Sequence, residues 1–192
     1  MEYLEYIKIA KKIRKILILG SGAVGKTSLT KVLKNEIPLK DMNGYCDYHR
    51  TLFVEIEQFK TENNNGTFQL FDLAGQLDLP FHATRDTARF TFSAVDLICF
   101  VLASDNTQSL IDLNEWVNIT KNYYNKAKVE VPPFILIKNK IDLENNIDDS
   151  LLEFVMPNFK AYFEISCFDG KGIDELKKWF NEFYNECNLE KE

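Results

Sequence analysis

One short stretch of the sequence has the composition and spacing of a phosphate-binding loop. It reads Gly20-Ser21-Gly22-Ala23-Val24-Gly25-Lys26-Thr27 and fits the pattern G-x-x-x-x-G-K-[ST]. Glycines let successive backbone N–H groups point at anionic oxygens, and the N-terminus of the helix expected next adds partial positive charge. Lys26 would bring a cation to the outer phosphates, and the Thr27 hydroxyl would bind Mg²⁺. We therefore predict that a nucleotide phosphate chain is bound by Gly20, Gly22, Ala23, Val24, Gly25, Lys26, Thr27 and Ser28.

A second motif, Asn139-Lys140-Ile141-Asp142, has residue types that can select a base. A carboxylate only accepts hydrogen bonds, and guanine offers it two adjacent donors where adenine presents a lone pair. Sites built on such pairing reject the mismatched ligand by about 10⁴-fold or more. Asp142 is thus expected to select guanine, Asn139 to tie loops together, and the Lys140 stem to cover a face of the base. An ordinary polar turn is the alternative. Ser166-Cys167 follow the last expected strand, where the Cys167 N–H is expected to donate to the guanine carbonyl.

The segment Asp72-Leu73-Ala74-Gly75-Gln76 has residues suited to phosphoryl chemistry. Asp72 would hold Mg²⁺ through a water, because Mg²⁺ keeps part of its hydration shell. The Gly75 N–H would meet the γ-phosphate, and Gln76, which is both donor and acceptor, would orient an attacking water. Thr51 begins another expected strand and would complete the Mg²⁺ shell while a γ-phosphate is present. Its alternative reading is an ordinary β-branched residue at the start of a strand.

Strands and helices alternate along the sequence. Short apolar runs bounded by charged residues, glycine or proline predict strands, and apolar residues at helical spacing predict helices. Strands are expected at residues 16–19, 52–59, 67–72, 95–103, 134–138 and 161–165. Helices are expected at residues 27–35, 109–125, 148–156 (closed by Pro157) and 173–187, with a loop at 36–50. The pattern predicts an α/β fold around a mostly parallel sheet, with one antiparallel hairpin that turns at residues 63–66.

Length and composition fit one globular domain. The 192 residues are 45% apolar, enough to build a core, and the net charge of −6 argues against nucleic-acid binding through a basic face. Cys46, Cys99, Cys167 and Cys187 are scattered, which favours a reducing, cytoplasmic location, and we expect no secretion signal or lipid anchor. Residues 1–14 predict a basic amphipathic helix, residues 15–187 the domain, and residues 188–192 a short tail. The helix would pack on the domain or contact a partner or a membrane surface, the latter only peripherally.

Across residues 15–187 the chain resembles a Ras-like small GTPase, with the motifs above in that family's order. The resemblance implies a three-layer sandwich with a six-stranded sheet flanked by helices, GTP as substrate and GDP as product. It also implies two switch loops, 37–51 and 73–90, on which activating, exchange and effector proteins dock. Gly22 matches the position where a larger side chain crowds the catalytic glutamine, so hydrolysis is expected. Phe168 stands where the family usually has Lys or a small residue, and its ring is expected to stack on guanine instead, with Tyr45 or Tyr48 over the base edge.

A closer resemblance is to prokaryotic MglA-type GTPases. Arg50-Thr51-Leu52-Phe53 looks like their R-T-L-F segment, and His82-Ala83-Thr84-Arg85 looks like their Asn-Ala-Ser/Thr-Arg stretch. That resemblance implies that Arg50 is a built-in arginine finger and that a roadblock-type dimer is a partner; a solvated surface charge is the alternative for Arg50. The chain departs from MglA-type members by keeping Asp72 and by having His82 for Asn, which leaves Rag-like and Arf-like branches open.

Taken together, these residues favour a GTP-hydrolysing molecular switch. Gln76, Lys26, Arg50 and Thr51 are the expected catalytic residues, and Thr27, Thr51 and Asp72 are expected to serve Mg²⁺. Nucleotide binding is further assigned to Gly75, Asn139, Lys140, Asp142, Ser166, Cys167 and Phe168. Two alternatives stay open: a module that binds GTP or GDP with negligible hydrolysis, and a P-loop kinase acting on a small molecule. The kinase would leave the motif at residues 139–142 without a purpose.

Overall fold

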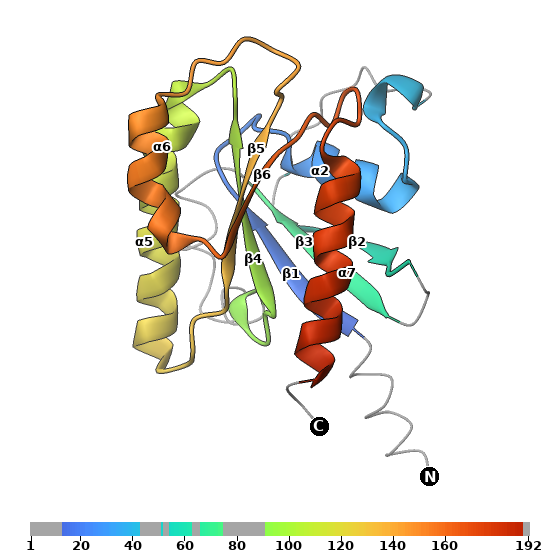
Figure 1. The fold of residues 1–192 in the computed structure, drawn as a ribbon. Helices are drawn as coiled ribbons and strands as arrows, with labels where there is room; N and C mark the ends of the chain where they lie inside the picture. The colour runs from blue at the N-terminus through green and yellow to red at the C-terminus, as the bar shows by residue number, and fades with distance from the viewer. Residues whose placement is uncertain (1–12, 43–50, 52–53, 63–65, 75–90, 190–192) are drawn as a thin grey trace.

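In the computed structural model, one sheet of six strands runs through the described part of the chain (Figure 1). The described residues are 13–42, 51, 54–62, 66–74 and 91–189. The predictions made for residues 1–12 of the N-terminal helix, for Arg50, for Gly75 and Gln76, and for Tyr45 and Tyr48 lie outside these residues.

The sheet has the strand order β2-β3-β1-β4-β5-β6. Its strands are β1 (Ile13–Leu19), β2 (Val54–Lys60), β3 (Thr67–Leu73), β4 (Leu97–Ala103), β5 (Phe134–Asn139) and β6 (Ala161–Glu164). β2 is antiparallel to β3, and the other neighbouring strands are parallel. Parallel strands covered on both faces are built from continuous apolar runs, and β4 is buried along its whole length. The predicted α/β fold with one antiparallel hairpin is confirmed.

Helices cover both faces of the sheet and complete a three-layer sandwich (Figure 1). Helices α5 (Thr107–Ala127) and α6 (Asp149–Val155) lie on one face, and α2 (Lys26–Asn35) and α7 (Ile173–Leu189) lie on the other. Each face has its own apolar core, with Phe100 and Trp116 on the α5 side and Leu29 and Phe180 on the α7 side. No helix among the described residues has both the length and the apolar content needed to cross a membrane.

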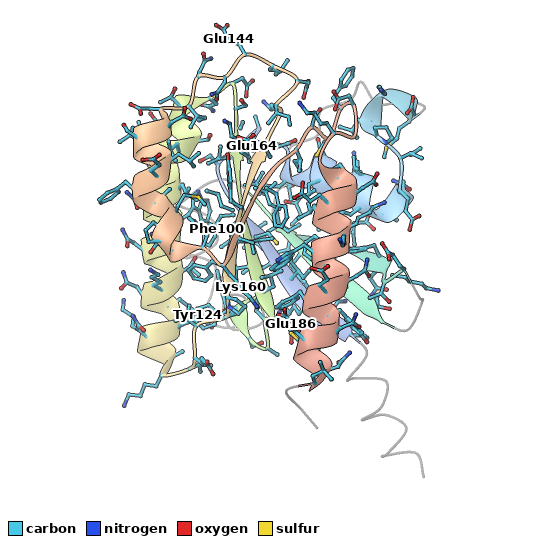
Figure 2. All side chains as sticks on the ribbon, in the orientation of Figure 1. Phe100, Tyr124, Glu144, Lys160, Glu164 and Glu186 are labelled. Carbon is cyan, nitrogen blue, oxygen red and sulfur yellow. The ribbon has the colours of Figure 1, made fainter. Side chains whose placement is uncertain are left out.

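The carboxyl ends of the parallel strands meet at one edge of the sheet, and the predicted site residues lie there. β1 leads into the phosphate loop, β3 contains Asp72, β5 ends at Asn139, and Ser166 comes shortly after β6. In open α/β sheets, ligands bind outside the carboxyl ends of the strands. Glu144 marks this edge in Figure 2, whereas Lys160 and Glu186 lie toward the opposite end.

Both ends of the described chain differ from the sequence expectation. β1 includes Ile13 and Arg14, which the sequence assigned to the N-terminal helix, because these residues pair with Thr67 and Phe68 of β3. At the other end, α7 continues to Leu189, two residues into the expected tail.

Two short 3₁₀ helices also differ from expectation. Pro157 does not close a helix: α6 ends at Val155, and Pro157 lies in η2 (Met156–Asn158), where its fixed φ suits a first helical turn. The expected loop at 36–50 contains η1 (Leu39–Asp41), a single turn that has no hydrophobic periodicity to announce it.

Candidate nucleotide-binding site

The phosphate loop joins β1 to α2, and its backbone conformation requires glycine at two positions. Gly20 has a φ of 142° and Gly25 a φ of 95°. A Cβ on Gly20 would lie 2.2 Å from the carbonyl oxygen of Val101, and a Cβ on Gly25 would lie 2.2 Å from Nδ2 of Asn139. Neither position can accept a side chain without a shift of its neighbours. The loop therefore brings its backbone close to β4 and β5 before it enters α2.

Lys26 is buried at the start of α2, with its ammonium group turned back onto the loop. Its Nζ donates to the carbonyl oxygens of Gly20 and Ser21, both at 2.8 Å. Burial lowers the pKa of Lys26 to about 8, and the nearby Asp72 carboxylate acts in the opposite direction. An anionic oxygen brought next to Nζ would stabilise the charged form. Lys26 is thus a buried cation at the end of the loop that is predicted to bind phosphate.

Thr27, Thr51 and Asp72 come from three separate segments and meet within hydrogen-bond distance. Thr27 Oγ1 donates to Asp72 Oδ2 at 2.5 Å and lies 3.1 Å from Thr51 Oγ1. Thr51 Oγ1 donates to the same carboxylate oxygen at 3.4 Å. The other oxygen, Asp72 Oδ1, is buried and has no hydrogen-bond partner among the described residues. Burial raises the pKa of Asp72, whereas the hydrogen bonds from the two threonines and the charge of Lys26 lower it.

This cluster fits a hard divalent cation. Hydroxyl and carboxylate oxygens suit Mg²⁺, which usually takes one or two carboxylates and completes its shell with water and substrate phosphate. A buried carboxylate oxygen without a partner is unfavourable unless positive charge stands nearby, so Asp72 Oδ1 suits such an ion. Among the described residues no three His, Cys, Asp or Glu side chains form a metal cluster. A cation here would therefore depend on water and phosphate oxygens for most of its ligands.

Asn139 joins the phosphate loop to the loop after β6. Its side chain is buried, and Nδ2 donates to the carbonyl oxygen of Val24 at 3.0 Å. Its Oδ1 accepts from the backbone N–H of Cys167 at 3.1 Å. Sequence reasoning expected that N–H to donate to guanine; the structure gives it a protein acceptor, so the contact with guanine stays a prediction. Asn139 thus connects the two ends of the predicted nucleotide site.

The motif at residues 139–142, which is predicted to select the base, is held by two further contacts. Ser166 Oγ donates to Asp142 Oδ1 at 2.6 Å, which orients this exposed carboxylate. Lys140 Nζ pairs with Asp105 at 3.1 Å, and Lys140 itself adopts a φ of 65°. Asp105 lies in the loop between β4 and α5. Sequence reasoning missed it, because nothing in the sequence marks this carboxylate as a partner of Lys140.

The loop after β6 presents an aromatic side chain next to a buried thiol. Burial raises the pKa of the Cys167 thiol to about 12, which keeps it protonated and unreactive at neutral pH. The Phe168 side chain is 44% exposed, and a ring in that position is accessible to a flat ligand.

The start of the first expected switch is hydrogen bonded to this same loop. The N–H of Leu39 donates to the carbonyl oxygen of Cys167 at 2.9 Å, and the N–H of Lys40 donates to that of Phe168 at 3.1 Å. A Cβ on Gly170 would lie 3.3 Å from Cβ of Pro38, so the two segments are in close contact. The sequence carries no signal for these contacts, because they are made by the backbone.

Three predicted site residues, Arg50, Gly75 and Gln76, lie outside the described part of the chain. Their described neighbours locate where the chain enters and leaves the site. Thr51, which follows Arg50, is within hydrogen-bond distance of Asp72. Ala74, which precedes Gly75, is buried just after the end of β3.

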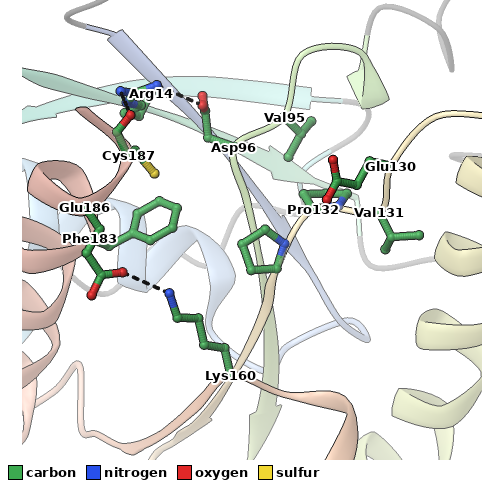
Figure 3. Close-up of a pocket in the computed structure, with 11 residues that line it drawn as sticks. Arg14, Val95, Asp96, Glu130, Val131, Pro132, Lys160, Phe183, Glu186 and Cys187 are labelled. Carbon is green, nitrogen blue, oxygen red and sulfur yellow. Dashed lines mark hydrogen bonds and ion pairs between the residues drawn. The ribbon is translucent and has the colours of Figure 1, made fainter. Parts of the chain in front are cut away.

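A separate pocket of about 400 Å³ lies at the amino ends of the parallel strands (Figure 3). Four of its charged side chains form two ion pairs, Arg14 with Asp96 at 3.2 Å and Lys160 with Glu186 at 2.9 Å. None of the described residues predicted to bind nucleotide lines it. The pocket is therefore distinct from the site at the carboxyl edge.

Comparison with known proteins identifies the family to which the chain is similar. The family model described as "Ras of Complex, Roc, domain of DAPkinase" matches residues 15–142, which run from β1 through the base-selecting motif. The GTP-binding protein RHO2 of Saccharomyces cerevisiae is 28% identical over 179 residues, which cover 85% of this chain and 84% of RHO2. The Ras-related protein Rab-7B of Dictyostelium discoideum is 27% identical over 187 residues, which cover 92% of this chain and 84% of Rab-7B.

A third relative places a similar segment inside a much longer protein. The Roc-COR-CHAT protease of Runella zeae is 27% identical over 186 residues, which are 91% of this chain but 19% of that protein. The family match covers most of the sheet, and the alignments with RHO2 and Rab-7B extend over most of the chain. The chain therefore belongs to the Roc family of Ras-like small GTPases, and it is a small GTP-binding protein that hydrolyses GTP as a molecular switch.

Proposed function

We propose that the chain hydrolyses GTP at the carboxyl edge of its sheet, with Mg²⁺ held where Thr27, Thr51 and Asp72 meet. The observation that carries this proposal is the convergence of the three side chains around a buried Asp72 oxygen to which no described residue donates a hydrogen bond. A cluster that served only the fold would normally satisfy that oxygen. Membership in a GTPase family also argues against the P-loop kinase alternative.

At the phosphate end, side chains of the described cluster would meet both the phosphates and the ion. Lys26 would move its ammonium from the Gly20 and Ser21 carbonyls toward the outer phosphates. Thr27 and Thr51 would turn their hydroxyl oxygens to the ion, and Asp72 would reach it through water. The bound ion would neutralise charge on the phosphate oxygens during transfer to water.

The two groups closest to the chemistry are assigned from the sequence. Gln76 would orient the attacking water, with the Gly75 N–H at the γ-phosphate, and Arg50 would stabilise charge that develops on the transferred group. Arg50 directly precedes Thr51, so a movement of Thr51 would move Arg50 as well. A Ras-type site without an arginine turns over at roughly 10⁻⁴ s⁻¹, and an arginine finger adds a factor of about 10³ to 10⁵. Arg50 would therefore determine whether the chain hydrolyses GTP slowly or fast.

At the base end, Asp142 would pair with the two guanine donors while Ser166 holds its carboxylate in place. Lys140, fixed by Asp105, would lay its stem over one face of the base. The exposed Phe168 ring would contact the base from the loop after β6. Asn139 would keep this end in register with the phosphate loop.

The switch function follows from Thr51. Its hydroxyl belongs to the ion cluster, so its position would depend on whether a γ-phosphate is present.

We expect regulators and effectors to dock on residues 37–51 and 73–90, and a roadblock-type dimer is our specific candidate. We further propose a cytoplasmic location with at most peripheral membrane contact; the two buried cysteines of the described residues, Cys99 and Cys167, are free thiols, which supports a reducing compartment.

Single-turnover GTP hydrolysis tests the catalytic assignment. The wild type would be compared with Gln76→Leu and Arg50→Ala, with Gln58→Leu on the exposed face of β2 as a matched control. We expect Gln76→Leu to lose most of the rate and the Gln58→Leu variant to keep it. Equal rates for the wild type and Gln76→Leu would mean that this glutamine does not position the water.

Two further measurements test the metal and the partners. Chelation of Mg²⁺ should speed release of GDP from the wild type, and much less so from Asp72→Ala, because that variant has already lost part of the ion site. A roadblock-type dimer should bind the GTP-analogue form more tightly than the GDP form. Equal binding to both forms would contradict docking that depends on the switch loops.

A further inference from the structure

A carboxylate on α5 is hydrogen bonded to the phosphate loop. Ser21 Oγ donates to Asp112 Oδ2 at 2.6 Å, and Gln108 Nε2, one turn earlier on α5, donates to Asp112 Oδ1 at 2.8 Å. Ser21 is nearly fully buried, with 9% of its surface exposed. Both oxygens of Asp112 are thus occupied by donors, one of which lies in the loop that is proposed to hold phosphate.

The residue that Asp112 holds is also one that holds Lys26. The carbonyl oxygen of Ser21 accepts from Lys26 Nζ at 2.8 Å, while its hydroxyl is fixed by Asp112. Fixing the side chain of Ser21 restricts how its peptide group can turn. Asp112 is therefore connected through Ser21 to the ammonium group of Lys26.

The start of α5 is at the same time fastened to the base end of the site. Thr107 Oγ1 donates to the carbonyl oxygen of Asn146 at 2.6 Å, and Asp105 pairs with Lys140. Just before α5, the Ser104 N–H donates to the carbonyl oxygen of Asn139 at 2.8 Å. One end of one helix thus contacts both the base-selecting loop and the phosphate loop.

We propose that Asp112 is a positioning residue that sets the shape of the phosphate loop and its distance from the base-selecting loop. The proposal rests on the nucleotide site described above and extends it to α5. A negative charge beside a loop that binds phosphate would repel the phosphate, so the charge of Asp112 does not explain why the carboxylate is there. With both oxygens accepting hydrogen bonds, its useful property is the acceptor at Ser21.

This distinction predicts how substitutions behave. Ser21→Ala and Asp112→Ala each remove the same hydrogen bond to a charged group, so each should speed GDP dissociation by about 10-fold. The double variant should be no faster than either single variant, because the two side chains act as one unit. Asp112→Asn keeps an acceptor for Ser21, and the Gln108 amide can turn to match it, so this variant should dissociate GDP within about 3-fold of the wild type.

The experiment measures release of a fluorescent GDP in excess Mg²⁺, together with the thermal midpoint of unfolding. Glu115→Ala is the control, since it removes an exposed carboxylate of the same helix that forms no hydrogen bond or ion pair with the described residues of the phosphate loop. A role in fold stability alone would lower the thermal midpoint without the non-additive rates and without rescue by asparagine. If Asp112→Ala fails to fold, Ser21→Ala and Asp112→Asn still decide the question.

The outcomes separate the two proposals. Additive effects in the double variant, or wild-type rates for Ser21→Ala, would overturn the role of Asp112 while leaving the nucleotide site intact. Failure of the wild type to bind GDP at all would instead overturn the site itself. Faster release that is non-additive and rescued in Asp112→Asn supports the positioning role.

Discussion

Removing the side chain of Asn139 should uncouple the two ends of the nucleotide site. The side chain is 2% exposed and makes two contacts, from Nδ2 to the Val24 carbonyl oxygen and from the Cys167 N–H to Oδ1. Asn139→Ala would leave a buried carbonyl and a buried N–H without these partners. It would also open space beside Gly25, whose Cα lies against Asn139.

The magnitude follows from the two lost hydrogen bonds. A buried polar group left without a partner costs about 1 to 3 kcal/mol, so two such groups amount to roughly 2 to 6 kcal/mol. Even the lower figure corresponds to about 30-fold in an equilibrium constant. Because both contacts lie between nucleotide-binding loops, we expect most of the loss to appear as weaker GDP binding, with dissociation at least about 30-fold faster.

The assay is GDP dissociation followed by stopped-flow fluorescence, alongside urea unfolding of the same samples. Asn114→Ala, on the exposed face of α5, is the matched control because it removes an asparagine outside the site. A folded Asn139→Ala protein that releases GDP at nearly the wild-type rate would refute the reasoning. It would show that the two loops keep their spacing without this side chain.

Two further predictions follow from charged groups. Burial lowers the pKa of Lys26 to about 8 from its ordinary value of 10.5, and bound phosphate oxygens should raise it again. Binding then takes up a proton, so GDP affinity should be constant below pH 8 and fall above it; calorimetry between pH 7 and 9 checks this, and an affinity independent of pH would contradict it. Arg14→Met breaks the buried pair with Asp96 and removes donors to Cys187 and Asn188, so it should lower the free energy of unfolding by about 3 kcal/mol. GDP dissociation should be unchanged in this variant, because Arg14 lies at the opposite end of the sheet; an equally stable protein in urea would show that the pair contributes nothing.

Local sequence signals predicted much of the fold. The continuous apolar run of β4 and the alternation of strands with helices were sufficient for the sheet class, because buried parallel strands need such runs. The order of the phosphate loop, Asp72, the Asn139 motif and Ser166 placed these residues at one edge, since each follows or ends a parallel strand. These features depend on neighbouring residues and on general rules of topology.

The contacts that hold the site in shape could not be predicted in this way. Ser21 and Asp112 are 91 residues apart, and Arg14 and Asn188 are 174 apart. A serine in a loop and an aspartate on a polar helix face are common, and neither carries a pattern that identifies a distant partner. The η1 turn was missed for a related reason, since its hydrogen bonds to residues 167 and 168 use backbone groups that every residue has.

The contact of Arg14 with α7 also brings the start and the finish of the described chain together. Arg14 Nη2 donates to the carbonyl oxygen of Cys187 at 3.0 Å and to Asn188 Oδ1 at 2.5 Å, so β1 begins where α7 ends. A domain whose entry and exit are adjacent can be spliced into a host polypeptide without stretching either junction. Adjacent ends suit a domain that is inserted as a unit into longer proteins during evolution. The same property would let an engineer graft this switch into a surface loop of an unrelated enzyme.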